Sequence, residues 1–445
     1  MKKKFILAGI LAILIITGFS QNDSSKIIKA KNPLSFQKGK SEFVISGFFR
    51  LRAEMQQNYN AKIYGTETTE SFLLSRIRLN MEYRYANCLK VFAEIQDARV
   101  AGSSFSDKDF QYKNNPFHDP FDINKLYFSY KPFDSVEIII GRQALNIENR
   151  RVFGPGDWGN TGRYIWDAAN IKYSNRFLTT QMVFGYNIMH QPNVFPNVNK
   201  EGTYAFATFN SIKNLPFLID LFYVYKYDET GKYISESNIS GNLYASYIGS
   251  KVQKTLHNLN LMFLGAYQFG KYATDKISAF GITTQLNYKF NTTWKPELML
   301  TYIYASGDNN LKNGIHQTFD GIFSGSDTDL YSWMNFIFWK NVHQYRADLI
   351  LNPAKKISVR SEYHAYFLDK TKDAWCFPGK AMRQDKQGLS GSFVGQELDF
   401  ISKIKIFKWF QFWGGYCFFV PGDFVKKTGN SPLAQWFFGE LTFIL

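Results

Sequence analysis

The sequence predicts an all-β protein: a single transmembrane antiparallel β-barrel of a bacterial outer membrane, with about eighteen strands. Three observations predict it. The N-terminus carries an export signal and no membrane helix follows it. The composition is rich in aromatic residues yet polar on average. Most of the chain alternates between apolar and polar residues, in segments that short and long connections separate in turn.

The N-terminus has the three parts of a signal peptide. Three lysines begin at Lys2, an apolar run covers 5–17, and the small residues Gly18 and Ser20 precede the expected cleavage before Gln21. Beyond this segment no apolar run reaches the roughly 18 residues that a membrane helix needs. Membrane insertion must therefore use strands.

The domain boundaries follow from this start. We expect a signal peptide at 1–20. The stretch 21–40 is polar and shows no sustained alternation, so we expect a flexible periplasmic segment there. The barrel then occupies 41–445.

Composition favours a barrel over a helical membrane protein. Aromatic residues make up 18% of the chain, charged residues 20%, and the mean hydropathy is −0.27. Strands with lipid on one side and water on the other, ending in aromatic girdles, have this balance. The net charge of +15 becomes +12 (15 − 3) without the signal lysines, which suggests acidic partners such as lipopolysaccharide or an anionic solute. Nucleic acid is not expected for an exported chain without a binding motif.

The clearest strand pattern lies between Arg76 and Tyr85. Arg76 and Arg78 share one face with three further polar residues, whereas Ile77 and Leu79 begin an apolar face. Successive side chains of a strand point to opposite faces, so one face suits lipid and the other water. A soluble sandwich is the alternative, but the aromatic strand ends favour lipid. The pattern recurs clearly in 279–290, 356–367 and 397–406, and poorly in 203–210 and 242–252.

Connections of two lengths alternate along the chain, as the short periplasmic turns and long extracellular loops of outer-membrane barrels do. Eight short turns are expected at 86–87, 132–134, 175–176, 214–216, 253–257, 291–293, 352–355 and 407–408. Nine longer loops are expected at 57–70, 100–120, 145–162, 188–201, 228–241, 270–277, 306–340, 369–392 and 421–434. These seventeen connections (8 + 9) separate about eighteen strands, and the apolar alternation of 436–445 suits a closing strand.

Strand alternation and nearness to the longest motif place eight arginines at the lumen or its mouth. Arginine makes planar bidentate contacts with carboxylates, so these side chains could guide uronate-like groups or form an anion-selective constriction. The alternative is that they pair with acidic residues as structural supports; for Arg142 and Arg163 the candidate partners are Asp167, Glu148 and Asp157. The eight are Arg50, Arg52, Arg76, Arg78, Arg142, Arg163, Arg346 and Arg360.

One long motif lies between two expected strands. It consists of Gly141, Arg142 and Gln143, then Gly154 and Pro155, then Trp158, Asn160 and Arg163, and finally Trp166, Asp167 and Ala168. This order resembles the alginate export family of outer-membrane porins, and the segments 304–308, 318–320 and 331–339 are similar to a second part of that family. The resemblance implies an eighteen-stranded monomeric barrel. It also implies a polar, arginine-lined pore through which an anionic uronate polymer leaves the periplasm.

Little in the sequence points to an enzyme or a cofactor. Six histidines and three isolated cysteines form no metal-binding spacing, and no nucleophile motif occurs. We therefore expect no catalysis and no cofactor. A calcium ion held by Asp308, Asn310, Asp327 and Asp329 is a minor alternative to a solvated loop.

Three functional hypotheses remain. The first is a passive secretion channel for an anionic, alginate-like polysaccharide or related anionic solutes. The second is an uptake porin for small anionic or sugar-like solutes, which shares every sequence feature with the first. The third is a structural or adhesive barrel with a plugged lumen, which would conduct poorly.

Overall fold

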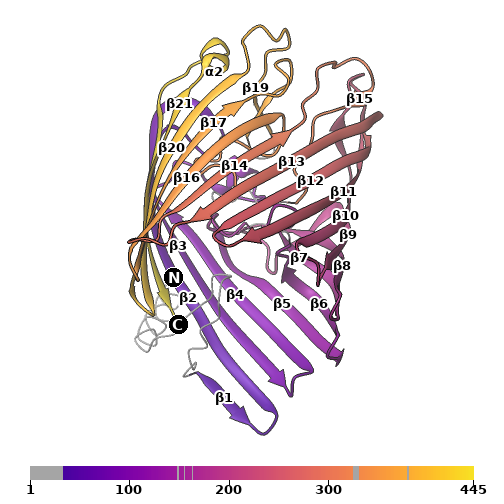
Figure 1. Cartoon of the computed structure of the whole chain (residues 1–445), viewed down its shortest axis with the longest axis vertical. Coiled ribbons are helices and arrows are strands. Elements are labelled where there is room, and N and C mark those ends of the chain that lie inside the picture. The colour runs from indigo at the N-terminus through magenta and orange to yellow at the C-terminus, as the bar shows by residue number, and fades with distance from the viewer. Residues whose placement is uncertain (1–33, 148–149, 155, 163, 324–329, 378–379) are drawn as a thin grey trace.

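Eighteen antiparallel strands close into one barrel in the computed structural model of the chain (Figure 1). The structure describes residues 34–147, 150–154, 156–162, 164–323, 330–377 and 380–445. Twenty strands belong to the main sheet; two of them, β1 (Ser35–Lys38) and β15 (Ile315–His316), are short additions, and the other eighteen (20 − 2) form the wall. The predicted fold class is confirmed.

The wall strands follow one another around the barrel in chain order. They are β2 (Ser41–Tyr59), β3 (Tyr64–Tyr85), β4 (Leu89–Ala101), β5 (Asp119–Phe133), β6 (Val136–Ala144), β7 (Ile165–Ser174), β8 (Leu178–Met189), β9 (Val198–Ile212), β10 (Leu218–Ile234), β11 (Ser240–Leu256), β12 (Leu259–Tyr272), β13 (Asp275–Lys289), β14 (Glu297–Ala305), β16 (Val342–Ala354), β17 (Ile357–Phe367), β20 (Phe393–Phe407), β21 (Phe410–Pro421) and β22 (Ala434–Ile444). The connections hold η1 (Asp107–Phe110), α2 (Asp423–Lys427), and a separate hairpin of β18 (Trp375–Phe377) and β19 (Lys380–Arg383).

Pairing of the first and last wall strands closes the ring. β2 and β22 run antiparallel from Phe48 opposite Ile444 to Gln57 opposite Gln435. Closure leaves no strand edge in the wall, so every wall strand has a hydrogen-bonding neighbour on both sides. The apolar alternation at the C-terminus belongs to this closing strand.

The expected connections are all present, but four of the long ones are shorter than the sequence suggested. Instead of long loops at 57–70, 188–201, 228–241 and 270–277, the chain leaves only 60–63, 190–197, 235–239 and 273–274 between strands. The short turn expected at 253–257 lies at 257–258. The flanking polar residues continue the β-ladder beyond the apolar band, because backbone pairing does not require an apolar side chain.

The segment before the barrel also differs from expectation. Residues 21–40 were expected to be flexible, but Ser35–Lys38 form β1, which pairs with the start of β2 from Ser35 opposite Val44. A turn at Gly39, with φ of +61°, allows the chain to reverse into this hairpin. The expected signal peptide and residues 21–33 lie outside the described residues. Figure 1 shows β1 projecting beside β2 at the edge of the barrel.

The two faces of the wall differ as the alternation predicted, except along part of the inner face. Large apolar side chains such as Leu221 and Phe263 are exposed on the outside. On β9 to β13 the inner face is mostly apolar too, with small buried residues such as Ala205, Ala245 and Ala279, although Lys226 lies directly between Ala205 and Ala245. An apolar inner face explains why 203–210 and 242–252 alternate poorly, and it requires something apolar inside the lumen.

Two further points concern helices and thiols. None of the helices in the described part of the chain is both long and apolar enough to cross a membrane. Cys88, Cys376 and Cys417 are free thiols.

The closure makes a testable distinction between the two chain ends. Deleting residues 34–40 removes β1 alone, and we expect that chain to fold and keep the heat-modifiable migration of barrels in detergent gels. Deleting 434–445 removes β22 and leaves β2 and β21 with unpaired edges, so we expect no folded band. Loss of folding in the first deletion, or folding of the second, would contradict this account of the ring.

Candidate channel constriction

Two connections fold into the lumen and touch one another. We name residues 145–164 the first inner loop and residues 306–341 the second inner loop. Their backbones join where Gly154 N–H donates to Phe323 O at 3.2 Å and Phe323 N–H donates to Val152 O at 3.0 Å. Phe153 and Phe323 pack against Trp166 of β7, with ring centroids 5.3 and 4.8 Å away.

Two glycines make room for this packing. A Cβ on Gly154 would lie 2.7 Å from Arg150 O, so the tight turn of the first inner loop excludes any other residue without a shift. A Cβ on Gly281, on the inner face of β13, would lie 2.8 Å from both Phe319 and Trp339 of the second inner loop. The second inner loop therefore packs against the inner face of β9 to β13, where many of the side chains are small.

Four arginines on β2 and β3 hold the first inner loop. We name Arg50, Arg52, Arg76 and Arg78 the arginine cluster; all four are buried, and Arg50 lies directly opposite Arg76. Like charges this close repel one another unless acceptors surround them. The loop supplies these acceptors: Arg76 donates to Asp157 O and Gly159 O at 3.0 Å, and Arg52 donates to Trp158 O at 2.9 Å.

Carboxylates balance most of this charge. Arg50 and Arg52 lie 3.7 and 3.4 Å from Glu440 of β22, Arg52 lies 2.7 Å from Glu54, and Arg78 lies 3.6 Å from Glu94 and 3.1 Å from Asp157. Lys125 lies 3.2 Å from Glu94. Among the described residues, the group thus has five cations and four carboxylates (5 − 4 = +1). Arg76 is the member whose described polar contacts are with carbonyl groups alone.

Asp157 of the first inner loop remains charged over a wide pH range. Desolvation raises the pKa of its carboxyl, but Arg78 and Arg76 lower the pKa further, and the net value lies well below the usual range. Because the folded pKa is depressed, the ion pair stabilises the loop at any pH above the ordinary Asp value. That contribution is lost only as the pH falls through the depressed value.

The two inner loops meet at Trp158 and Trp333. Their rings lie edge to face with centroids 5.4 Å apart. Trp158 also contacts Trp436 and Phe438 of β22 at 5.6 and 4.9 Å, and the Arg52 guanidinium lies 4.1 Å above its ring. This aromatic contact inside the barrel narrows the lumen, and we take it as the centre of the candidate constriction.

Asn160 fixes the first inner loop to the wall. Its side-chain amide donates to Ser75 O at 3.1 Å and to Arg99 O and Phe117 O at 2.9 Å, while its carbonyl oxygen accepts from Arg50 at 3.3 Å. One buried residue thus connects the loop to β3, β4 and the loop before β5.

The second inner loop is held by carboxylates on β17 and β20, so here the wall accepts hydrogen bonds and the loop donates them. Glu397 accepts from Ser332 Oγ at 2.7 Å and from Met334 N–H at 3.0 Å, and Glu362 accepts from Trp333 Nε1 at 2.8 Å. The first inner loop therefore offers carbonyl acceptors to arginines, and at β17 and β20 the second offers N–H and O–H donors to carboxylates. On the opposite side the second loop accepts from Lys226 of β10, through Asp320 at 2.8 Å and Ile322 O at 3.3 Å.

Arg346 and Arg360 lie in this acidic region and are engaged there. Arg346 contacts Asp348 and Glu362 at 2.7 and 2.8 Å, and Arg360 contacts the same two residues at 2.6 and 2.7 Å. This closed ring of two arginines and two carboxylates matches the structural alternative that the sequence left open.

Glu362, His364 and Asp399 have the geometry of a possible metal site, with one candidate ligand atom from each within 4.8 Å of the others. Gln344 Nε2, which also donates to Tyr331 O, lies 2.8 Å from His364 Nδ1. An amide nitrogen only donates, so Nδ1 is the acceptor in that contact, and Nε2 of the same ring lies 3.0 Å from Asp399 and 3.2 Å from Glu362. In the described structure the histidine thus contacts both carboxylates at ion-pair distance.

Arg142 does not join the arginine cluster. It shares the outward face of β6 with the exposed Ile140, and forms a bidentate pair with Asp167 of β7 at 2.9 and 3.1 Å. It also donates to Asn197 O at 2.7 Å. The expected placement of Arg142 at the lumen is thus corrected: it braces the outer side of the wall beneath the loop before β9.

The other motif residues have structural positions. Gly141, with φ of +121°, brings β6 so close to β5 that a Cβ would lie 2.4 Å from Leu126 O. Gln143 faces the lumen and accepts from Asn170 at 3.0 Å. Pro155 and Arg163 lie outside the described residues.

Asp308, the first residue of the expected calcium site, stabilises its own loop instead. The Asp308 carboxylate accepts from Asn310 N–H at 3.0 Å and from Gln317 N–H at 3.1 Å, which stabilises its own loop. Asp327 and Asp329 lie outside the described residues.

The sequence did not identify the residues that hold the second inner loop. Glu397, Ser332 and Trp333 carry no recognisable motif; the only signal was the aromatic run 331–339 in an otherwise polar connection. Two cavities adjoin the first inner loop, of about 150 Å³ beside Trp158 and of about 280 Å³ beside Tyr164.

Asn160→Ala tests whether the first inner loop depends on this one amide. We expect about 1–3 kcal/mol of destabilisation, the usual cost of leaving buried partners unsatisfied, and brief current steps as the loop detaches. Thermal melting and single-channel recording measure the two effects. Asn310→Ala, at an exposed side chain, is the control; equal behaviour of both variants would show that the loop is held without Asn160.

Comparisons with known proteins agree with this architecture. The family model for alginate export matches residues 44–438. Solved structures with the same fold include Acinetobacter baumannii OccAB2, with a TM-score of 0.61 and 10% identity over 90% of this chain and 98% of that one. Pseudomonas aeruginosa OccK8 (OprE) gives 0.59 and 10% over 90% and 98%. No curated protein matches. Because the family model covers most of its length, the chain belongs to the alginate export family of outer-membrane channel proteins.

Proposed function

We propose that this chain is a passive outer-membrane channel for anionic, uronate-like solutes. The observation that carries the proposal is the surplus cation at the candidate constriction. Arg76 binds the carbonyl groups on either side of Trp158 and belongs to a group whose net charge is +1 (5 − 4) among the described residues. A charge beside a narrow, low-dielectric passage selects the ion that crosses it.

The family supports the same class of solute. Its description names alginate export, and alginate is an anionic uronate polymer of the kind that the sequence motif already implied. Within the proposal, lipid and lipopolysaccharide surround the barrel, one chain forms one channel, and diffusion through the lumen requires no cofactor.

Two charge changes of opposite sign test the proposal. Arg76→Gln removes the surplus cation, and Asp157→Asn removes an anion from the same group. We expect the first to lower and the second to raise the ratio of anion to cation permeability by about fivefold, since one unit charge at about 4 Å is worth about 1 kcal/mol even in water.

The measurement is the reversal potential of single channels in a planar bilayer under a salt gradient. Arg176→Gln, which removes the same charge from an exposed turn, is the matched control and should leave the ratio unchanged. A wild type without anion preference, or shifts of the same sign in both variants, would refute the role of the arginine cluster in selection.

The small cavities beside the first inner loop favour a second candidate, an uptake channel for short acidic sugars. With the two loops packed together, cavities of about 150 and 280 Å³ suit single sugar rings better than a polymer strand. In that case the loops would stay in place during transport, whereas polymer export would require them to separate.

Trp158→Ala distinguishes the two candidates. Removing this ring breaks the contact between the loops, so we expect conductance to rise about twofold or more as the constriction widens. If uronate oligomers cross the wild type as readily as single uronates, export is favoured; if only the variant passes oligomers, uptake of short solutes is. Trp294→Ala, at an exposed turn, is the control. Unchanged conductance would place the constriction elsewhere.

A further inference from the structure

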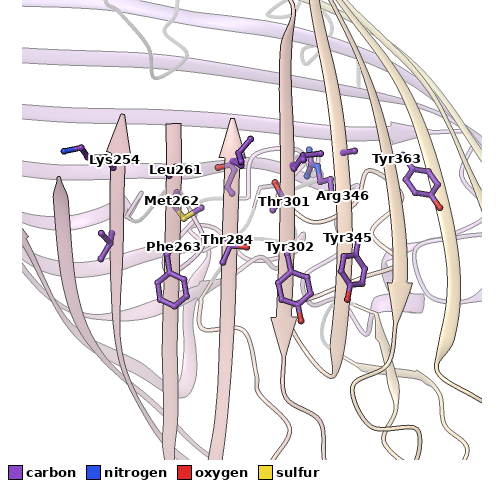
Figure 2. Close-up of a pocket in the computed structure, with 15 residues that line it drawn as sticks. Lys254, Leu261, Met262, Phe263, Thr284, Thr301, Tyr302, Tyr345, Arg346 and Tyr363 are labelled. Atoms are coloured by element: carbon purple, nitrogen blue, oxygen red, sulfur yellow. The ribbon is translucent and has the colours of Figure 1, made fainter. Parts of the chain in front are cut away.

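A cavity of about 740 Å³ lies on the outer face of the barrel wall (Figure 2). Strand register shows its construction. One outward row runs across five strands through Val252, Phe263, Thr284, Tyr302 and Tyr345. A second outward row, two residues closer to the short turns, runs across six strands through Lys254, Leu261, Leu286, Leu300, Ala347 and Tyr363.

The floor of this groove is backbone. Between the two rows lies a third, whose Met262, Thr301 and Arg346 side chains are buried on the lumenal side, so this row offers only main chain to the outside. Two small residues deepen the hollow: Thr284 lies between Phe263 and Tyr302, and Ala347 lies between Leu300 and Tyr363. The groove therefore exists because each of two rows of large outward residues contains one small residue.

The aromatic row forms one side of the groove. Figure 2 shows the rings of Phe263, Tyr302 and Tyr345 in one row and pointing the same way, with Thr284 between the first two and Lys254 beyond the Phe263 end of the row. From β11 to β17 the groove crosses five strand spacings, about 24 Å at about 4.8 Å each. That length suits one extended acyl chain.

A single cation stands at the mouth of the groove. Lys254 lies two residues before the end of β11, next to a short turn, and its Nζ donates to Pro216 O of the neighbouring turn at 2.6 Å. Short turns face the periplasm in outer-membrane barrels. The ammonium therefore lies at the level of the periplasmic headgroups, with further protons available for a phosphate.

We propose that this groove is a binding site for one phospholipid of the periplasmic leaflet, with its acyl chain between the two rows and its phosphate at Lys254. The place of the cation selects the source, because lipopolysaccharide occupies the opposite leaflet. Lipid tails are as apolar as the leucines that line the groove, so the hydrophobic effect contributes little. Retention comes from the packing contacts that fill the hollow and from the phosphate contact.

Filling the hollow tests the acyl site. Ala347→Phe places a ring in the hollow between Leu300 and Tyr363 of the second row. Ala93→Phe, on the outward face of β4 between Met81 and Leu126, makes the same change at a position that does not line this groove. Each refolded barrel is titrated in detergent with phosphatidylglycerol and examined by native mass spectrometry.

We expect wild type and Ala93→Phe to keep one phosphatidylglycerol, and Ala347→Phe to bind it roughly tenfold more weakly, a ratio that corresponds to about 1.4 kcal/mol. Lys254→Gln removes the phosphate contact without filling the groove, and we expect it to weaken binding as well. This second variant keeps the test decisive if Ala347→Phe does not fold.

Three results would overturn the proposal: a wild-type barrel that retains no phospholipid, equal retention by Ala347→Phe and Ala93→Phe, or preferential retention of lipid A in a parallel titration. None of these readouts depends on conduction, so the site stands or fails independently of the channel proposal.

Discussion

The structure depends on the cost of burying four guanidinium groups inside one barrel. Arg50, Arg52, Arg76 and Arg78 crowd onto two adjacent strands, and charges removed from water must find partners. Carboxylates of the wall pair with some of these guanidinium groups, and the backbone carbonyls of Asp157, Trp158 and Gly159 accept the remaining hydrogen bonds. The same arginines thus hold the first inner loop in the lumen and supply the charge beside it. The shape and the electrostatics of the constriction therefore have one origin.

Much of this fold could be predicted because lipid imposes a strict pattern on a barrel wall. Strand alternation placed the arginine cluster on the inner face, and the alternation of short and long connections placed the turns to within a few residues. The prediction failed where the two faces of a strand do not differ in polarity. The inner face of β9 to β13 is apolar because a loop packs on it, so 203–210 and 242–252 show little contrast between faces. Around Arg142 the sequence Ile138, Ile139, Ile140 gives no alternation at all, and the outward direction of Arg142 was hidden.

The residues that hold the two inner loops could not be predicted from the sequence, for a different reason. The arginines are held largely by main-chain carbonyls, and a carbonyl belongs to every residue, so no residue type marks it. The anchors Glu397 and Ser332 are ordinary polar residues separated by 65 positions. Their pairing follows from the register of distant strands rather than from any local spacing. The motif residues that the sequence did single out, Gly141 and Asn160, are those whose backbone geometry or hydrogen bonding is unusual.

The alanines of the inner wall bear on what opening means in this barrel. If the second inner loop moved aside, water would meet small residues such as Ala205 and Ala245 with Lys226 directly between them, and Lys226 would lose its contact with Asp320 of the loop. Water wets the apolar part of this wall reluctantly, whereas an unpaired ammonium group must find water or an anion. Displacing the loop would therefore expose one uncompensated cation on a wall that is otherwise largely apolar. A sugar polymer could cover the apolar residues with one ring face and place a carboxylate at Lys226, so that the cargo would replace the contacts that the loop gives up.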